Sequence, residues 1–179
     1  MISLLILTPH AEENSTGRAY VWWLLARHLG WSARIVSYKG EKVWAPLQGS
    51  SFSEDLTIST ARGSSRSRNF SDLSRNFDVV VAVKPLPDSL GIALAAQRLA
   101  KIPLLIDIDD PDLAARLDRG PLWRRTAWRI RYFPFWWRVQ APKQLNKLGA
   151  VAVSNPVLQS IYGGTLVPHA RYAPAETKP

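Results

Sequence analysis

The stretch Asp78-Val-Val-Val-Ala-Val83 decides the fold, because it is rich in β-branched residues and apolar at every position after the first. A strand that is apolar on both faces is typical of a parallel sheet covered by helices on both sides. Other strand-like runs occur at the apolar run Ile2–Thr8, at the β-rich run Ala33–Tyr38, at Pro103–Ile108 and Ala150–Ser154, and at the short last run Thr165–Val167. Helical spacing at Gly17–Leu29 and Ser89–Ala100 separates them. The sequence therefore predicts an α/β fold, a doubly wound, Rossmann-like parallel sheet.

Length and composition exclude several classes of protein. The chain has 179 residues, 46% hydrophobic and 21% charged, which fits one globular domain. It has no cysteine, so disulfide scaffolds, thiolate metal sites and cysteine nucleophiles are excluded, and its three histidines favour no metal site. No apolar run approaches the ~20 residues that cross a bilayer, and no secretory leader precedes the first run. We expect a cytoplasmic protein that needs no cofactor.

Two stretches depart from a minimal version of this fold. Residues 48–76 are rich in serine, arginine and glycine and predict an irregular loop. Residues 109–148 form a long insertion, which we expect to be mostly helical. The predicted domain spans residues 1–169, and residues 170–179 have the composition of a linker.

The positive charge is concentrated in the insertion. The net charge is +9, and residues 116–143 alone hold eight basic residues, one acidic residue and four of the eight tryptophans. A basic, aromatic segment on a nearly neutral domain indicates an anionic partner surface. On a helical wheel, an apolar stripe lies opposite arginines that are interleaved with aromatic residues, and packing in the core would explain that stripe. The residues predicted to meet an anionic membrane are Trp123, Arg124, Arg125, Trp128, Arg131, Tyr132, Trp136 and Trp137.

Ligands of open parallel sheets bind outside the carboxyl ends of the strands, so the residues that follow each strand are candidates for a site. After the first strand, Ser15 or Thr16 could cap a helix, and Gly17 could let a ligand approach the N-terminus of that helix. This loop has neither the spacing of a dinucleotide-binding glycine motif nor that of a Walker loop. Lys84 follows the second strong strand and either meets a phosphate or hydroxyl-rich ligand or is simply solvated.

The sharpest local signal is Asp107-Ile-Asp-Asp-Pro-Asp112. Clustered carboxylates can accept hydrogen bonds from sugar hydroxyls, bind a cation, or merely form a turn that caps the next helix. We take Asp107, Asp109 and Asp110 as substrate-binding candidates because acidic clusters at such a crevice are costly without a role. Ser154, a plausible helix N-cap, and Asn155 follow a later strand, and His169 follows the last one.

Taken together, these segments resemble the N-terminal, acceptor-binding domain of GT-B glycosyltransferases of the family 4 type. The resemblance rests on Thr16-Gly17 before the first helix, Phe77-Asp-Val-Val-Val-Ala-Val, Leu104-Leu-Ile-Asp-Ile-Asp-Asp, and the closing pair Leu148-Gly-Ala-Val-Ala-Val-Ser-Asn-Pro-Val-Leu and Tyr162-Gly-Gly-Thr-Leu-Val-Pro-His. It implies a domain that holds a lipid-linked or glycan acceptor. The nucleotide-sugar donor would be bound by a second, C-terminal domain, without which this chain would be inactive.

Two departures from the family pattern limit what carries over. Many relatives have a histidine beyond the strand at Pro103–Ile108, where this chain has aspartates. The usual asparagine–glycine pair after the last strand is here His169-Ala170. We therefore name no catalytic base.

Three functions compete at this point. The first is transfer of a sugar to a membrane-linked or polymeric acceptor, given a donor domain. The second is a non-catalytic module that docks on an anionic membrane, at the inner face of the cell membrane, or on an acidic partner. The third, binding of single-stranded nucleic acid by the Arg/Trp segment, is the weakest because the charge lies in one insertion and no recognisable module is present.

Overall fold

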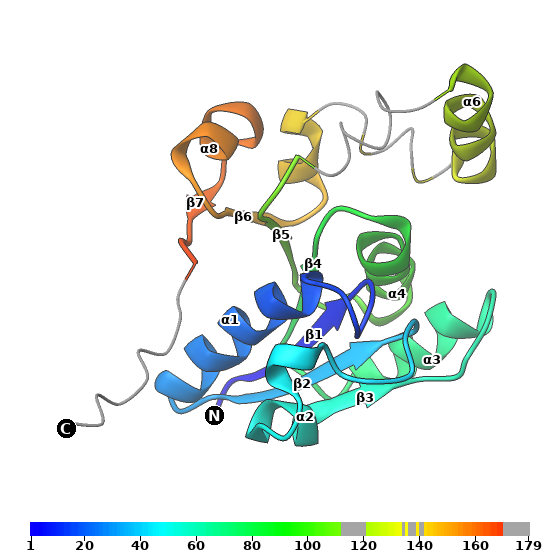
Figure 1. Cartoon of the computed structure of the whole chain (residues 1–179). Helices are drawn as coiled ribbons and strands as arrows, with labels where there is room; N and C mark the ends of the chain where they lie inside the picture. The colour runs from blue at the N-terminus through cyan, green and yellow to red at the C-terminus, as the bar shows by residue number, and fades with distance from the viewer. Residues whose placement is uncertain (112–120, 134, 136–138, 140–141, 170–179) are drawn as a thin grey trace.

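The computed structural model describes residues 1–111, 121–133, 135, 139 and 142–169, and confirms the predicted α/β class. Seven strands form one sheet in the order β3-β2-β1-β4-β5-β6-β7, and every neighbouring pair is parallel (Figure 1). The order reverses between β1 and β4, which is the switch point of a doubly wound sheet. The strands are β1 Ser3–Thr8, β2 Ser32–Ser37, β3 Leu56–Ile58, β4 Val79–Val83, β5 Leu104–Ile108, β6 Ala150–Val153 and β7 Thr165–Leu166.

Six α-helices lie within the described residues: α1 Ser15–His28, α2 Ser51–Asp55, α3 Ser65–Ser74, α4 Ile92–Ala100, α6 Leu122–Arg131 and α8 Pro156–Tyr162. The predicted helix at Ser89–Ala100 is α4 preceded by a π-helical turn at Pro87–Gly91. Short 3-10 turns occur at Ala45–Leu47 and Pro142–Lys147. The tail at 170–179 lies outside the described residues.

Alternating side chains of the central strands build two cores, one on each face of the sheet. Leu4 and Ile6 of β1 pack with α1 and α2, whereas Leu5 and Leu7 pack with α3, α4 and α8. All four residues are buried because β1 is sandwiched between helices, as its unbroken apolar sequence predicted. The buried cores thus hold the carboxyl ends of β1, β4 and β5 side by side.

The prediction of an irregular loop at residues 48–76 is wrong, because this segment contains α2, the edge strand β3 and α3. Two aromatic side chains, Phe52 and Phe70, are fully buried on opposite faces of the sheet and anchor the segment. Leu56 of β3 pairs with Ile35 of β2. The polar composition hides these elements because α2 and α3 each bury one large side chain and β3 has no fully buried residue.

The insertion is helical where it is described, in α6 and in the 3-10 turn that follows. Figure 1 shows α6 beyond the carboxyl edge of the sheet, away from the two layers of covering helices. Residues 112–120, Pro134 and the pair Trp136 and Trp137 lie outside the described residues. In the described part of the chain, no helix has both the length and the apolar character needed to span a bilayer.

Candidate functional site

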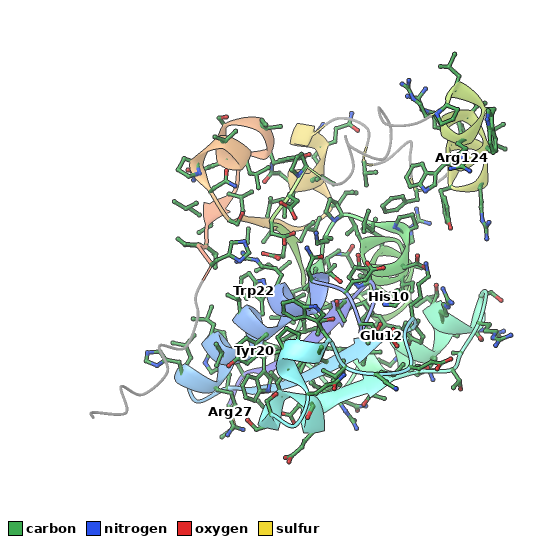
Figure 2. The ribbon with its side chains drawn as sticks, viewed as in Figure 1. His10, Glu12, Tyr20, Trp22, Arg27 and Arg124 are labelled. Atoms are coloured by element: carbon green, nitrogen blue, oxygen red, sulfur yellow. The ribbon has the colours of Figure 1, made fainter. Side chains whose placement is uncertain are left out.

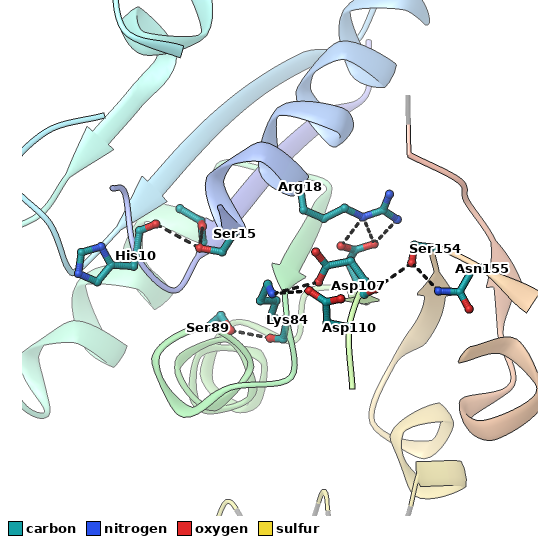
Figure 3. A network of polar contacts seen from close by, with 11 residues as sticks. His10, Ser15, Arg18, Lys84, Ser89, Asp107, Asp110, Ser154 and Asn155 are labelled. Atoms are coloured by element: carbon teal, nitrogen blue, oxygen red, sulfur yellow. Dashed lines mark hydrogen bonds and ion pairs between the residues drawn. The ribbon is translucent and has the colours of Figure 1, made fainter. Parts of the chain in front are cut away.

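Polar side chains gather at the carboxyl edge of the sheet, near the switch point, and those that follow β4, β5 and β6 are linked by hydrogen bonds and ion pairs (Figure 3). Among the sequence-predicted residues, the structure brings together Lys84, Asp109, Asp110, Ser154 and Asn155. Thr16 and Gly17 lie in the first turn of α1. The Asp107 side chain pairs with Arg18 instead, and His169 lies near enough to Asp107 to affect its charge.

The loop between β1 and α1 is held by the hydroxyl groups of the first turn of α1. Thr16 Oγ1 donates to the carbonyl oxygens of His10 (2.8 Å) and Ala11 (3.0 Å), and Ser15 Oγ donates to His10 (3.2 Å). The predicted capping role of Ser15 or Thr16 is wrong, because both lie inside α1 and Asn14 is its N-cap residue. A Cβ on Gly17 would lie 2.9 Å from the Trp44 ring, so Trp44 occupies the space expected for a ligand.

Asp107 forms a fully buried ion pair with Arg18 of α1. Arg18 Nε and Nη2 donate to the Asp107 carboxylate at 2.7–3.0 Å, and both side chains are 0% exposed. Arg18 also donates to the carbonyl oxygens of Val167 (2.9 Å) and Pro168 (3.4 Å), beyond β7. Burial raises the pKa of the Asp107 carboxyl, and the Arg18 guanidinium and nearby His169 oppose that rise. Asp107 is therefore placed to hold α1, β5 and the end of β7 together rather than to contact a ligand.

Lys84 adopts a left-handed backbone conformation (φ 64°) directly after β4, which is uncommon for a residue with a side chain. Its N–H donates to Asp107 O at 2.8 Å, and its carbonyl accepts from the Ser89 hydroxyl at 2.6 Å. Lys84 is only 5% exposed, which rules out the alternative that it is a simply solvated lysine. Its ammonium group lies 3.5 Å from Asp109 Oδ1 and 3.2 Å from Asp110 Oδ2.

The two carboxylates beside Lys84 differ in exposure. The Asp109 side chain is 8% exposed and that of Asp110 is 55% exposed. Ser154 Oγ donates to the Asp109 carbonyl at 3.0 Å and accepts from Asn155 Nδ2 at 3.3 Å. Asn155, not Ser154 as predicted, caps α8, because its side chain accepts the Leu158 N–H at 2.9 Å. Asp110 is thus an accessible hydrogen-bond acceptor whose position is held by a buried lysine.

Two hollows open at this edge of the sheet, and His10 and Lys39 line both. One, of about 500 Å³, lies over the ends of β2 and β3 and includes Tyr38, Arg62 and Arg66. Burial raises the pKa of Tyr38 to about 12, and its hydroxyl donates to Asn69 Oδ1 at 2.8 Å.

The second hollow, about 370 Å³, lies between α6 and the loops that follow β1 and β4. Figure 2 shows Arg124 on α6 and His10 on the loop that follows β1. Asp88 lines this hollow and forms ion pairs with Lys39 (2.6 Å) and Arg66 (3.0 Å). In the described part of the chain, no group of three or more histidine or acidic side chains could hold a metal ion.

Helix α6 exposes its apolar stripe and turns its arginine-bearing face toward the domain. The alternative that the apolar stripe packs in the core is wrong, because Leu122, Trp123 and Ile130 are 75%, 66% and 71% exposed. Trp128 and Tyr132, from the arginine-bearing face, are half-buried, and Trp128 packs against the core. The sequence gives two faces of a helix but not which of them meets the domain.

The structure adds residues that sequence reasoning missed. Arg18 carried a signal, since it is a charged residue directly before the predominantly apolar run Ala19–Ala26. His10, Lys39, Asp88 and Arg66 carried none, because their proximity depends on contacts between loops remote in sequence.

Comparison with known proteins identifies no family. No protein-family model matches this sequence, and no curated protein matches it. The chain is a Rossmann-like parallel α/β domain. Its function is therefore inferred from its geometry and from the resemblance of its motifs.

Proposed function

We propose that this chain is the acceptor-binding half of a GT-B-like glycosyltransferase, acting on a lipid-linked or glycan acceptor. The observation that carries the proposal is the network of Lys84, Asp109, Asp110 and Ser154 at the carboxyl ends of β4, β5 and β6, beside the switch point. It lies where open parallel sheets bind ligands, and its exposed Asp110 carboxylate can accept hydrogen bonds from sugar hydroxyls.

In this proposal, the residues have separate roles. Asp110 contacts the acceptor, and Lys84 positions Asp110. The Arg18–Asp107 pair fixes the helix and strands beneath them. The nucleotide-sugar donor is assigned to a second Rossmann-like domain, whose groups would stabilise the charge that develops on the donor phosphates.

A transfer assay tests this proposal. Labelled nucleotide sugars and a panel of glycan and glycolipid acceptors are incubated with the chain alone, with a candidate donor domain alone, and with both. We expect transfer only from the pair, and a large fall in turnover when Asp110→Asn is used. The control Asp72→Asn removes an exposed carboxylate from α3. Transfer by the chain alone, or an Asp110→Asn variant as active as wild type, would contradict the proposal.

A second role, docking on an anionic membrane, is supported by the surface of α6. Its exposed apolar residues, among them Leu122 and Ile130, lie on a helix with four arginines and no acidic residue. Such a helix can bury its apolar stripe at the acyl boundary while arginines meet lipid phosphates. Each basic residue near an anionic surface adds about 1 kcal/mol. The docking partner proposed is therefore a bilayer that contains acidic lipid.

Co-sedimentation with vesicles tests the docking role. Binding should require acidic lipid, weaken with salt, and fall at least tenfold in a Leu122→Ser/Ile130→Ser variant. A Leu99→Ser/Val157→Ser variant, which removes exposed apolar residues from α4 and α8, should bind as wild type does. Equal binding to neutral vesicles, or no binding at all, would contradict docking by α6.

A further inference from the structure

The hollow behind α6 is lined by basic and apolar side chains, none of which belongs to the network of Lys84, Asp109, Asp110 and Ser154. It has a volume of about 370 Å³ and lies between α6 and the loops that follow β1 and β4. Apolar surface comes from Leu86, Pro87 and Trp128. The basic side chains on its walls are His10, Lys39, Arg124 and Arg131.

Two of these cations have no acidic partner among the residues that the structure describes. The Arg124 guanidinium lies 5.1 Å from the centre of the Trp123 ring, and that of Arg131 lies 5.6 Å from the centre of the Tyr132 ring. Within the part of the chain that the structure describes, neither arginine is within 4 Å of a carboxylate. Stacking on a ring orients a guanidinium and leaves its N–H groups able to bind an oxyanion at two points.

The acidic groups on the walls do not cancel this charge. Asp88 is already paired with Lys39 at 2.6 Å and with Arg66 at 3.0 Å. Glu13 is the other carboxylate among the lining residues, so one further negative charge stands against the positive charges of Arg124 and Arg131. The hollow therefore keeps an excess of positive charge beside an apolar and aromatic surface.

We propose that this hollow binds a phosphate group carried on a sugar or on an apolar body, with Arg124 and Arg131 as its oxyanion ligands. Trp128, half-buried on the side of α6 that packs against the core, supplies a ring surface for the body of the ligand. Identifying that ligand as the acceptor rests on the proposed function, and it would make the acceptor a phosphorylated one. Binding of phosphate by the hollow does not depend on the transferase proposal.

Calorimetric titration of the chain with two soluble probes tests this site. The probes are glucose 1-phosphate and dihexanoyl phosphatidylglycerol below its micelle concentration, and methyl glucoside is the uncharged comparison. We expect at least one phosphate probe to bind, and its affinity to fall at least tenfold in an Arg124→Gln/Arg131→Gln variant. An Arg75→Gln/Arg98→Gln variant loses the same charge from exposed positions elsewhere and should bind as wild type does.

The outcome of the titration decides whether the site exists and which class of ligand it binds. Binding of the sugar phosphate alone assigns a soluble ligand, and binding of the lipid alone assigns a headgroup. Three results would overturn the site. They are no binding of either probe, equal binding of methyl glucoside, and equal binding by an Arg124→Gln/Arg131→Gln variant that urea unfolding shows to be folded. Phosphate binding without any transfer by the two-domain pair would contradict only the proposed function.

Discussion

At the scale of single residues, the buried Arg18–Asp107 pair is the strongest constraint on the fold. Removing one partner leaves the other charged and buried, which costs about 3–5 kcal/mol. We expect Arg18→Met or Asp107→Asn to lower the free energy of unfolding by that amount in urea titrations. The double variant Arg18→Met/Asp107→Asn should lose less stability than the two single variants combined. Single variants within about 1 kcal/mol of wild type would contradict this role.

The buried Tyr38 hydroxyl should make the folded state less stable at alkaline pH. Burial raises its pKa to about 12, whereas a tyrosine in the unfolded chain ionises near pH ~10. Between these values the unfolded state loses a proton that the folded state keeps, so stability falls as the pH rises. Between about pH 9.5 and 11.5, wild type should lose about 1–2 kcal/mol more stability than Tyr38→Phe. Parallel stability curves for the two proteins would contradict the assignment.

At the scale of elements, the segment from α2 to α3 depends on one buried side chain in each helix. Truncating fully buried Phe70 should lower the free energy of unfolding by about 3–5 kcal/mol. Because the segment is rich in arginine, Phe70→Ala should also speed tryptic cleavage within residues 62–75. Leu99→Ala, at an exposed position of α4, is the matched control. Unchanged cleavage in Phe70→Ala would show that α3 is not held by this contact.

The same elements show what the sequence could and could not predict. Apolar runs predicted β1, β4 and β5, because strands buried on both faces must be apolar throughout. β3 was missed since its three residues become a strand only by pairing with distant β2. Lys84 and Asp110 were predicted as site residues from their places after strands. Arg18 was not, because 89 positions separate it from its partner Asp107.

At the scale of the whole molecule, the proposed function gives the acceptor to this chain and the nucleotide sugar to a second domain. The carboxyl edge of the sheet carries an exposed acidic acceptor of hydrogen bonds at Asp110 and a basic hollow behind α6. The loop before α1 carries no glycine motif for a nucleotide diphosphate, and Trp44 covers Gly17 at its end. A domain of this kind should bind acceptors and ignore nucleotide sugars.

Amide chemical-shift mapping of the isolated chain measures this directly. The labelled protein is titrated with nucleotide sugars and, separately, with the panel of glycan and glycolipid acceptors. We predict that an acceptor shifts the resonances of Lys84, Asp110 and Asn155 while nucleotide sugars leave them unchanged at millimolar concentration. Micromolar binding of a nucleotide sugar at these residues, or the absence of shifts there with every acceptor tested, would contradict it.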